Sequence, residues 1–286
     1  PSGASILWAG LYWGGYTNNG GRTQVRLRTP ASGYVTVNAA QTDASGQAYK
    51  CFADVTALVQ AGGAGTYMAA NVRSTPNTSN VHAGWALVVA YGVAGAPPRN
   101  LVVYDGYALV SGTTTVNINV SGFVTPPAGA VHTRLGVVTW EGDLGYTGDS
   151  FRLNGTPLTD GENPATNFFN SSISQLGARF TAKNPDYVNQ YGFDADLVDA
   201  TGLLPNGATG ATITLTTNGD TYYPGVVAFS TDLYAPVFDA ANFTKTVTDL
   251  NGGAVQPGDV LEYAVTMRNA GQDHATACVM RDTLPA

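Results

Sequence analysis

The sequence is poor in charge, and positive charge is the scarcer of the two signs. Only 12% of its 286 residues are Asp, Glu, Lys or Arg, and 13 Lys and Arg stand against 20 Asp and Glu, for a formal net charge of −7. Binding to nucleic acid needs clustered Lys and Arg, because these side chains replace the counterions of the phosphates. We therefore expect no nucleic-acid partner.

Long apolar runs are lacking as well. No stretch reaches the roughly 18 consecutive apolar residues that a membrane-spanning helix needs, and the sequence begins at Pro1 without a basic leader. We expect no membrane span in these residues, and we expect any signal or anchor to lie outside them.

Cysteine and histidine are rare. Cys51 and Cys278 have no metal-binding spacing and are candidates for at most one disulfide. His82, His132 and His274 stand in unrelated segments, without a Gly-x-Ser-x-Gly motif or a metal-binding His pair. Because neither a nucleophile motif nor a metal-binding pair is apparent, we predict that the protein is not an enzyme.

Strand signals dominate what is present. The sequence holds 35 Gly, 15 Pro and 15 Tyr, and 44% of its residues are hydrophobic. Residues 115–120 and 212–216 alternate apolar and polar side chains, which predicts half-exposed strands, whereas residues 84–91 are apolar on both faces, which predicts a central strand. Short strands joined by Gly-, Pro- and Asn-rich turns are typical of jelly-roll or Greek-key sandwiches. The predicted fold class is all-β.

A weak duplication organises the first 235 residues. Residues 6–14 and 134–142 are apolar strands ending in Trp and Gly, and each is followed by a short strand, an acidic segment, a Gly-rich turn and a strand pair. The spacing agrees, since 30 residues separate Asp54 from Gly84 and 29 separate Asp196 from Gly225. We predict two tandem β-sandwiches packed side by side.

The pattern changes after residue 235. The later segment has a Lys-bearing strand, a Pro-Gly-Asp turn, a Tyr-containing strand, an Asn-x-Gly turn and an Asp-Thr-Leu-Pro motif, at residues 243–249, 257–259, 261–268, 269–271 and 282–285. In this order they resemble the opening half of the immunoglobulin-like repeat found in tandem on bacterial and archaeal surface proteins. Arg281 stands where that repeat usually has a Thr. Residues 1–235 resemble, less sharply, the domain that often precedes such repeats in adhesin-like proteins.

The predicted organisation is therefore a first β-sandwich at 1–110, a second at 111–238 and an incomplete immunoglobulin-like segment at 239–286. The resemblance implies an extracellular structural or adhesive module at the cell surface. An immunoglobulin-like sandwich needs about 100 residues, so the short tail leaves two alternatives. Either downstream repeats of the same protein complete it, or it adds a strand to a neighbouring copy and builds a filament.

The same resemblance implies a crosslink at Lys245. In related domains a buried Lys of the first strand joins an Asn of the last strand with the help of a carboxyl group, for which Glu262 and Asp282 are the candidates here. The Asn would lie beyond Ala286. The alternative is an ordinary solvated lysine.

Acidic loops offer oxygen ligands for a cation. Glu141, Asp143 and Asp149 are of the kind that Ca²⁺ accepts, and a plain turn rich in Asp and Gly is the alternative.

A second acidic group consists of Asp194, Asp196 and Asp199. It is also rich in oxygen ligands, but Asp54 and Asp196 stand at equivalent places of the two copies. There we expect carboxylates that cap short helical turns.

Aromatic side chains give a second functional hypothesis, a carbohydrate-binding module that Ca²⁺ assists. Strand alternation places Trp8 and Tyr12 on one face and Trp13 on the other, so we expect Trp13 or Tyr16 to be exposed for stacking on sugars. A less favoured alternative is a glycan-acting enzyme with Glu141 and Asp143 as its carboxylates.

Overall fold

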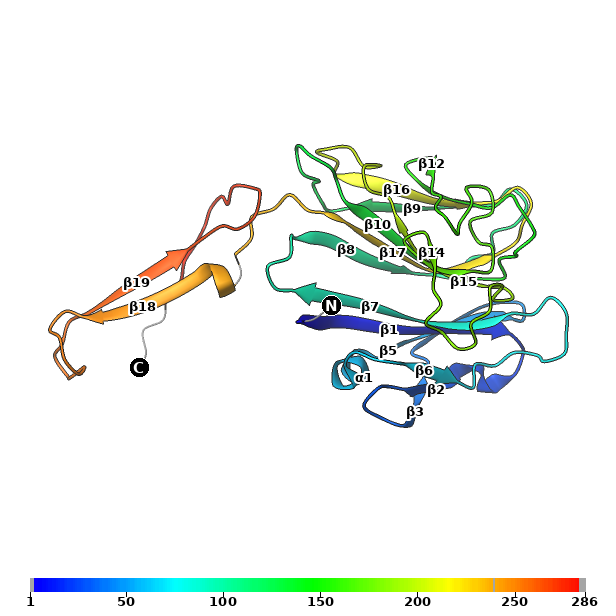
Figure 1. The fold of residues 1–286 in the computed structure, drawn as a ribbon, viewed down its shortest axis with the longest axis horizontal. Helices are drawn as coiled ribbons and strands as arrows, with labels where there is room; N and C mark the ends of the chain where they lie inside the picture. Colours follow the sequence, from blue (N-terminus) through cyan, green and yellow to red (C-terminus); the bar gives the residue numbers. More distant parts are fainter. Residues whose placement is uncertain (1–2, 239, 283–286) are drawn as a thin grey trace.

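The computed structural model describes residues 3–238 and 240–282. Within these residues the strands form five sheets, and only short helical segments interrupt them. The predicted all-β fold class is confirmed (Figure 1). In the described part of the chain, no helix has the length and apolar character needed to cross a bilayer.

The first sandwich pairs a four-stranded sheet with a three-stranded sheet, in the orders β4-β5-β1-β7 and β3-β2-β6. Its elements are β1 (Ala4–Tyr16), β2 (Gln24–Arg28), β3 (Tyr34–Asn38), β4 (Gln41–Ser45), β5 (Ala48–Asp54), α1 (Thr56–Gly62), β6 (Met68–Ala70) and β7 (Ala83–Val93). Leu11 and Trp13 of one sheet pack against Val25 and Leu27 of the other in a buried core. Because side chains alternate along β2, Val25 and Leu27 point to the core and the intervening Arg26 points to solvent.

The second sandwich pairs a six-stranded sheet with a four-stranded sheet, in the orders β14-β13-β15-β10-β17-β8 and β12-β11-β16-β9. Its strands are β8 (Arg99–Asp105), β9 (Thr115–Ser121), β10 (Thr133–Trp140), β11 (Ser150–Leu153), β12 (Thr156–Pro157), β13 (Ile173–Gln175), β14 (Ala178–Arg179), β15 (Phe193–Asp199), β16 (Gly210–Thr216) and β17 (Tyr223–Asp232). The aromatic rings of Phe151, Phe168, Phe169 and Tyr222 form the centre of its core. Because β8 pairs with β17, it belongs to this sandwich, whereas the predicted boundary at residue 110 placed it in the first.

The strand order of the first sandwich recurs in the second. In the first, β1 lies between β5 and β7, and in the second β10 lies between β15 and β17. The two Trp residues differ in orientation: Trp13 and its partner Cys51 point into the core of the first sandwich, whereas Trp140 and its partner Phe193 point into the core between the sandwiches. The copies differ after this strand, because α1 follows β5, whereas β15 leads into a turn.

The two sandwiches are stacked through their larger sheets (Figure 1). A third core lies between these sheets and is formed by Tyr12 together with Val138, Trp140, Phe193 and Val226. The strand β7 is covered on both faces, by the first core and by this third core. It nevertheless lies at the hydrogen-bonded edge of its sheet, so the prediction of a central strand is wrong.

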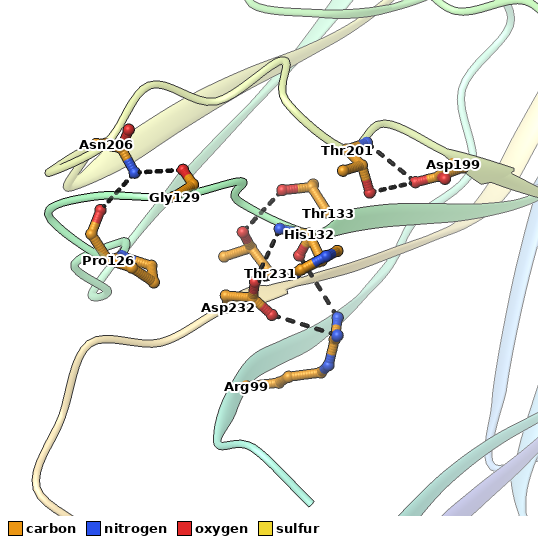
Figure 2. A network of polar contacts seen from close by, with 10 residues as sticks. All are labelled: Arg99, Pro126, Gly129, His132, Thr133, Asp199, Thr201, Asn206, Thr231 and Asp232. Carbon is orange, nitrogen blue, oxygen red and sulfur yellow. Dashed lines mark hydrogen bonds and ion pairs between the residues drawn. The ribbon is translucent and has the colours of Figure 1, made fainter. Parts of the chain in front are cut away.

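A polar network fixes the point where the chain leaves the second sandwich (Figure 2). The carboxylate of Asp232, at the end of β17, accepts hydrogen bonds from the backbone N and Nδ1 of His132 at 2.8 and 2.7 Å. Arg99 of β8 forms an ion pair with the same carboxylate at 3.2 Å. Three neighbouring segments are thereby joined at the base of the C-terminal extension.

The C-terminal extension is a two-stranded antiparallel sheet of β18 (Phe243–Asp249) and β19 (Leu261–Met267), preceded by the 3-10 turn η2 (Ala240–Asn242). It stands apart from the stacked sheets (Figure 1). The register places Phe243 beside Met267 and Val247 beside Tyr263, all on one face. Residues 283–285 of the predicted Asp-Thr-Leu-Pro motif lie outside the described residues.

Candidate functional site

Three carboxylates meet at one end of the second sandwich. Glu141 directly follows β10, Asp143 lies two residues further on, and Asp220 belongs to the loop that leads into β17. One oxygen of each lies within 4.8 Å of the others. The backbone of Glu141 turns sharply here, with a φ of +80°, and its N–H donates to the carbonyl of Gly192 at 2.8 Å.

Burial disfavours the charged form of all three carboxyl groups. Burial raises the pKa of Glu141 to about 8, with a further contribution from the charges of Asp143 and Asp220. Burial also raises the pKa of Asp220 to about 7 and raises that of Asp143. Oε2 of Glu141 and Oδ2 of Asp220 are buried without a hydrogen-bond partner among the described residues. Such a group can share protons or hold a hard cation through its oxygens.

Asp149 does not belong to this group, contrary to the prediction. The structure brings Glu141 and Asp143 together, as predicted, but the third member is Asp220. Asp149 is fully buried, and its Oδ1 accepts a hydrogen bond from the backbone N–H of Phe169 at 2.9 Å. Burial raises its pKa.

Sequence reasoning missed Asp220 although a signal for it existed. In the register of the two strands, Trp140 at the end of β10 faces Tyr223 at the start of β17. The loop after Trp140 and the loop before Tyr223 must therefore lie side by side. Recognising 134–140 and 223–232 as neighbouring antiparallel strands would have placed Asp220 beside Glu141.

Two further carboxylates are buried in β15, where they bind the neighbouring segment. Asp194 accepts the backbone N–H of Ser172 at 3.0 Å, and Asp196 accepts the backbone N–H and the hydroxyl of Ser174 at 3.1 and 2.7 Å. Burial raises the pKa of Asp194 and raises that of Asp196 to about 7. Both side chains thereby join β15 to residues 172–174 inside the second sandwich.

The predicted capping role is confirmed for Asp54 and wrong for Asp196. Oδ1 of Asp54 accepts the backbone N–H of Thr56 in the first turn of α1 at 2.8 Å. Asp196 lies within β15, and Asp199 at the end of that strand caps the following turn instead, through the N–H and hydroxyl of Thr201. In both copies the carboxylate that binds the following turn is therefore the last residue of its strand, Asp54 in β5 and Asp199 in β15.

The prediction that Trp13 is exposed for sugar binding is wrong. It is completely buried, and its Nε1 donates to the carbonyl of Arg22 at 2.9 Å. Tyr16 is half-buried, and its ring lies 6.2 Å from that of His82. His82 is 3% exposed, and burial lowers its pKa to about 4, so the imidazole is neutral at pH 7. It packs against Tyr223 as well, at 6.0 Å.

Exposed aromatic rings occur instead on the loops around the acidic group. Tyr191 is 69% exposed and packs edge-on against the exposed Tyr187 at 6.1 Å. Tyr191 directly precedes Gly192, the residue whose carbonyl holds Glu141. Tyr146, also exposed, lies three residues after Asp143 on the other loop.

Lys245 lies beside one of its two predicted carboxyl partners. Its Nζ forms an ion pair with Asp282 at 2.7 Å and lies 4.6 Å from the ring centroid of Tyr263. Glu262 pairs with Thr248 on the opposite face of the hairpin. The Lys245 side chain is 33% exposed, whereas crosslink formation needs desolvated partners. The crosslink therefore stays a prediction.

The two cysteines do not pair. Cys51 is buried in β5 and Cys278 is exposed in the C-terminal extension, and both thiols are free. Burial raises the pKa of Cys51, whose sulfur lies 3.3 Å from the hydroxyl of Thr42. Its role is packing in the first core.

The fold and this site define a double β-sandwich protein with a carboxylate cluster at one end of its second sandwich. No family model and no curated protein matches the chain. Among solved structures, it is similar to a β-porphyranase of glycoside hydrolase family 86 from the human gut bacterium Bacteroides plebeius, with 11% identity over 82% of this chain and 31% of that one, at a TM-score of 0.30. Another is BuGH86 in complex with neoagarooctaose, with 11% identity over 79% of this chain and 27% of that one, at a TM-score of 0.29.

A viral protein matches as well. The VP2 subviral particle of infectious bursal disease virus shows 9% identity over 80% of this chain and 57% of that one, at a TM-score of 0.25. The chain spans about a third of the length of the glycoside hydrolases that it matches. These likenesses concern the sandwich fold alone.

The prediction that the protein is not an enzyme is wrong. Glycoside hydrolases are among the structures that match, and the chain does bring carboxyl groups together.

Proposed function

We propose that this chain is an extracellular adhesive or structural module of a bacterial surface protein, whose C-terminal hairpin joins β-strands of a neighbouring copy. The single observation that carries this proposal is the amphipathic character of the hairpin. Phe243, Val247, Tyr263 and Met267 are all exposed on one face, and Val247 is 54% exposed. The opposite face carries threonines at 244, 246, 248 and 266.

A sheet with one apolar face is half of a sandwich. A two-stranded hairpin is at best marginally stable alone, and at least a third strand or a covering layer stabilises it. Lys245, on the apolar face, is reached by Asp282, and residues 273–279 border Phe243 and Met267. The rest of the apolar face is open among the described residues. Strand addition would satisfy the outer edges of β18 and β19, and the copy that adds the strand would pack over the apolar face.

The test is the association state of the chain. Sedimentation over a range of concentrations is expected to show self-association that Val247→Lys abolishes. Thr246→Lys is the matched control, since it places the same charge on the polar face of the same strand. A chain that stays monomeric at every concentration, or an equal effect of both substitutions, would overturn the proposal.

A second candidate, glycan binding, is favoured by the exposed rings of Tyr187 and Tyr191. Tyrosine rings supply a large contact area at a low entropic cost, and they stack on sugar faces. Binding to a glycan array is expected to disappear in Tyr191→Ala. It should persist in Tyr34→Ala, which removes an exposed ring from the first sandwich. Loss of binding in both variants, or in neither, would reject this site.

A further inference from the structure

We propose that Glu141, Asp143 and Asp220 form a calcium site that fastens the loop after β10 to the loop before β17. This site is independent of the hairpin and of the association proposed above. It uses two of the three residues that the sequence indicated and replaces the third with Asp220.

The geometry fits a single ion. One oxygen from each residue lies within 4.8 Å of the other two. Ca²⁺ holds its oxygen ligands at about 2.3–2.6 Å, so two ligands of one ion are at most about 5 Å apart. The three oxygens can therefore reach a common centre without any large movement of the loops.

Unsatisfied buried oxygens point independently to a missing ligand. Asp220 is only 3% exposed, and its Oδ1 accepts the N–H of Thr221 at 2.7 Å, but its Oδ2 has no hydrogen-bond partner among the described residues. Glu141 is half-buried, and its buried Oε2 also has no hydrogen-bond partner among these residues. A buried polar atom without a partner costs about 1–3 kcal/mol, and more when it is charged. Within residues 3–238 and 240–282, no Lys, Arg or His forms an ion pair with these carboxylates.

The donor set selects calcium. All three side chains offer oxygen and none offers the imidazole or thiolate that zinc prefers. Ca²⁺ accepts irregular loop geometry and fills its remaining positions with carbonyl oxygens or water, whereas Mg²⁺ requires near-ideal octahedral geometry. Gly142, between two of the ligands, lets this loop pack closely on the second sandwich, because a Cβ there would collide with Asp194 and with the backbone of Phe169.

The experiment is calorimetric titration of the EDTA-treated full chain with CaCl₂ at pH 7.5, with MgCl₂ as a second arm. We expect one Ca²⁺ per chain, a rise in melting temperature, and weaker binding of Mg²⁺. Asp220→Asn and Glu141→Gln should each weaken calcium binding at least tenfold. Asp54→Asn is the control, because this residue lies in the first sandwich and Asn caps a helix as well as Asp does.

Two results would overturn the site. One is the absence of heat and of thermal stabilisation up to roughly 10 mM CaCl₂, which exceeds the ~10⁻³ M dissociation constants of weak extracellular calcium modules. The other is binding that Asp220→Asn and Glu141→Gln leave unchanged. Should either variant fail to fold, Asp143→Asn at the half-buried loop position decides the matter, because calcium binding that this substitution leaves unchanged would equally reject the site.

Discussion

Replacing Gly84 with alanine is expected to strain the contact between the two sandwiches. Gly84 lies in β7, and a methyl group on it would overlap the ring of Phe193 in β15. Phe193 is buried and packs edge-on against Trp140 at 5.7 Å, so its ring has little room to move. Overpacking of a buried contact costs about 1–3 kcal/mol, and we expect Gly84→Ala to lower the free energy of unfolding by this amount.

Urea unfolding, followed by tryptophan fluorescence, measures this loss. Gly92 of the same strand supplies the control, because a Cβ there would have no neighbour closer than 3.6 Å. Gly92→Ala should be neutral or stabilise the protein by about 0.4–1 kcal/mol. Phe193→Ala alone should cost about 3–5 kcal/mol, and in its background Gly84→Ala should cost little, since the ring is gone. An equal cost of Gly84→Ala in both backgrounds would refute the proposed contact.

Three further predictions concern buried polar groups. Burial raises the pKa of Asp220 to about 7, so the stability contributed by its protonated form is full below the ordinary carboxyl pKa and is lost as pH rises through about 7. Without calcium, the free energy of unfolding in urea should be lower at pH 8 than at pH 5, and Asp220→Asn should reduce this difference by about 2–4 kcal/mol, the remainder coming from other buried carboxyl groups such as Glu141. In the folded chain a thiol reagent should modify Cys278 at once and the buried Cys51 only on unfolding, which mass spectrometry would detect. Lys50 is fully buried and forms an ion pair with Asp105 of β8 across the two sandwiches; Lys50→Met should lower the free energy of unfolding by about 3 kcal/mol in the same urea assay.

The fold class and the duplication could be predicted because both depend on local patterns. Alternation in residues 115–120 and 212–216 marks half-exposed strands, and β9 and β16 indeed form one side of the second sandwich. The repeated Trp strands, 6–14 and 134–142, became the central strands β1 and β10. Each of these signals is determined by which face of a strand meets the nearest core.

The stacking of the sandwiches could not be predicted, and two errors follow from it. Residues 84–91 are apolar on both faces because one core covers each face, and this pattern says nothing about whether a strand has one hydrogen-bonded neighbour or two. Trp13 was expected to be exposed because Trp8 and Tyr12 point the other way. Both faces of β1 are covered, since Trp13 lies in the first core and Tyr12 in the core between the sandwiches. The alternation of side chains along a strand shows which residues share a face, but not which part of the protein covers that face.

The same stacking requires a glycine near the end of β1. A Cβ on Gly14 would lie 2.6 Å from the carbonyl of Tyr49 and 2.8 Å from the ring of Trp140, so no carboxylate can stand there while the sheets are stacked. Packing of the two sandwiches against each other therefore excludes any side chain at position 14, a constraint that the sequence of β1 alone does not reveal.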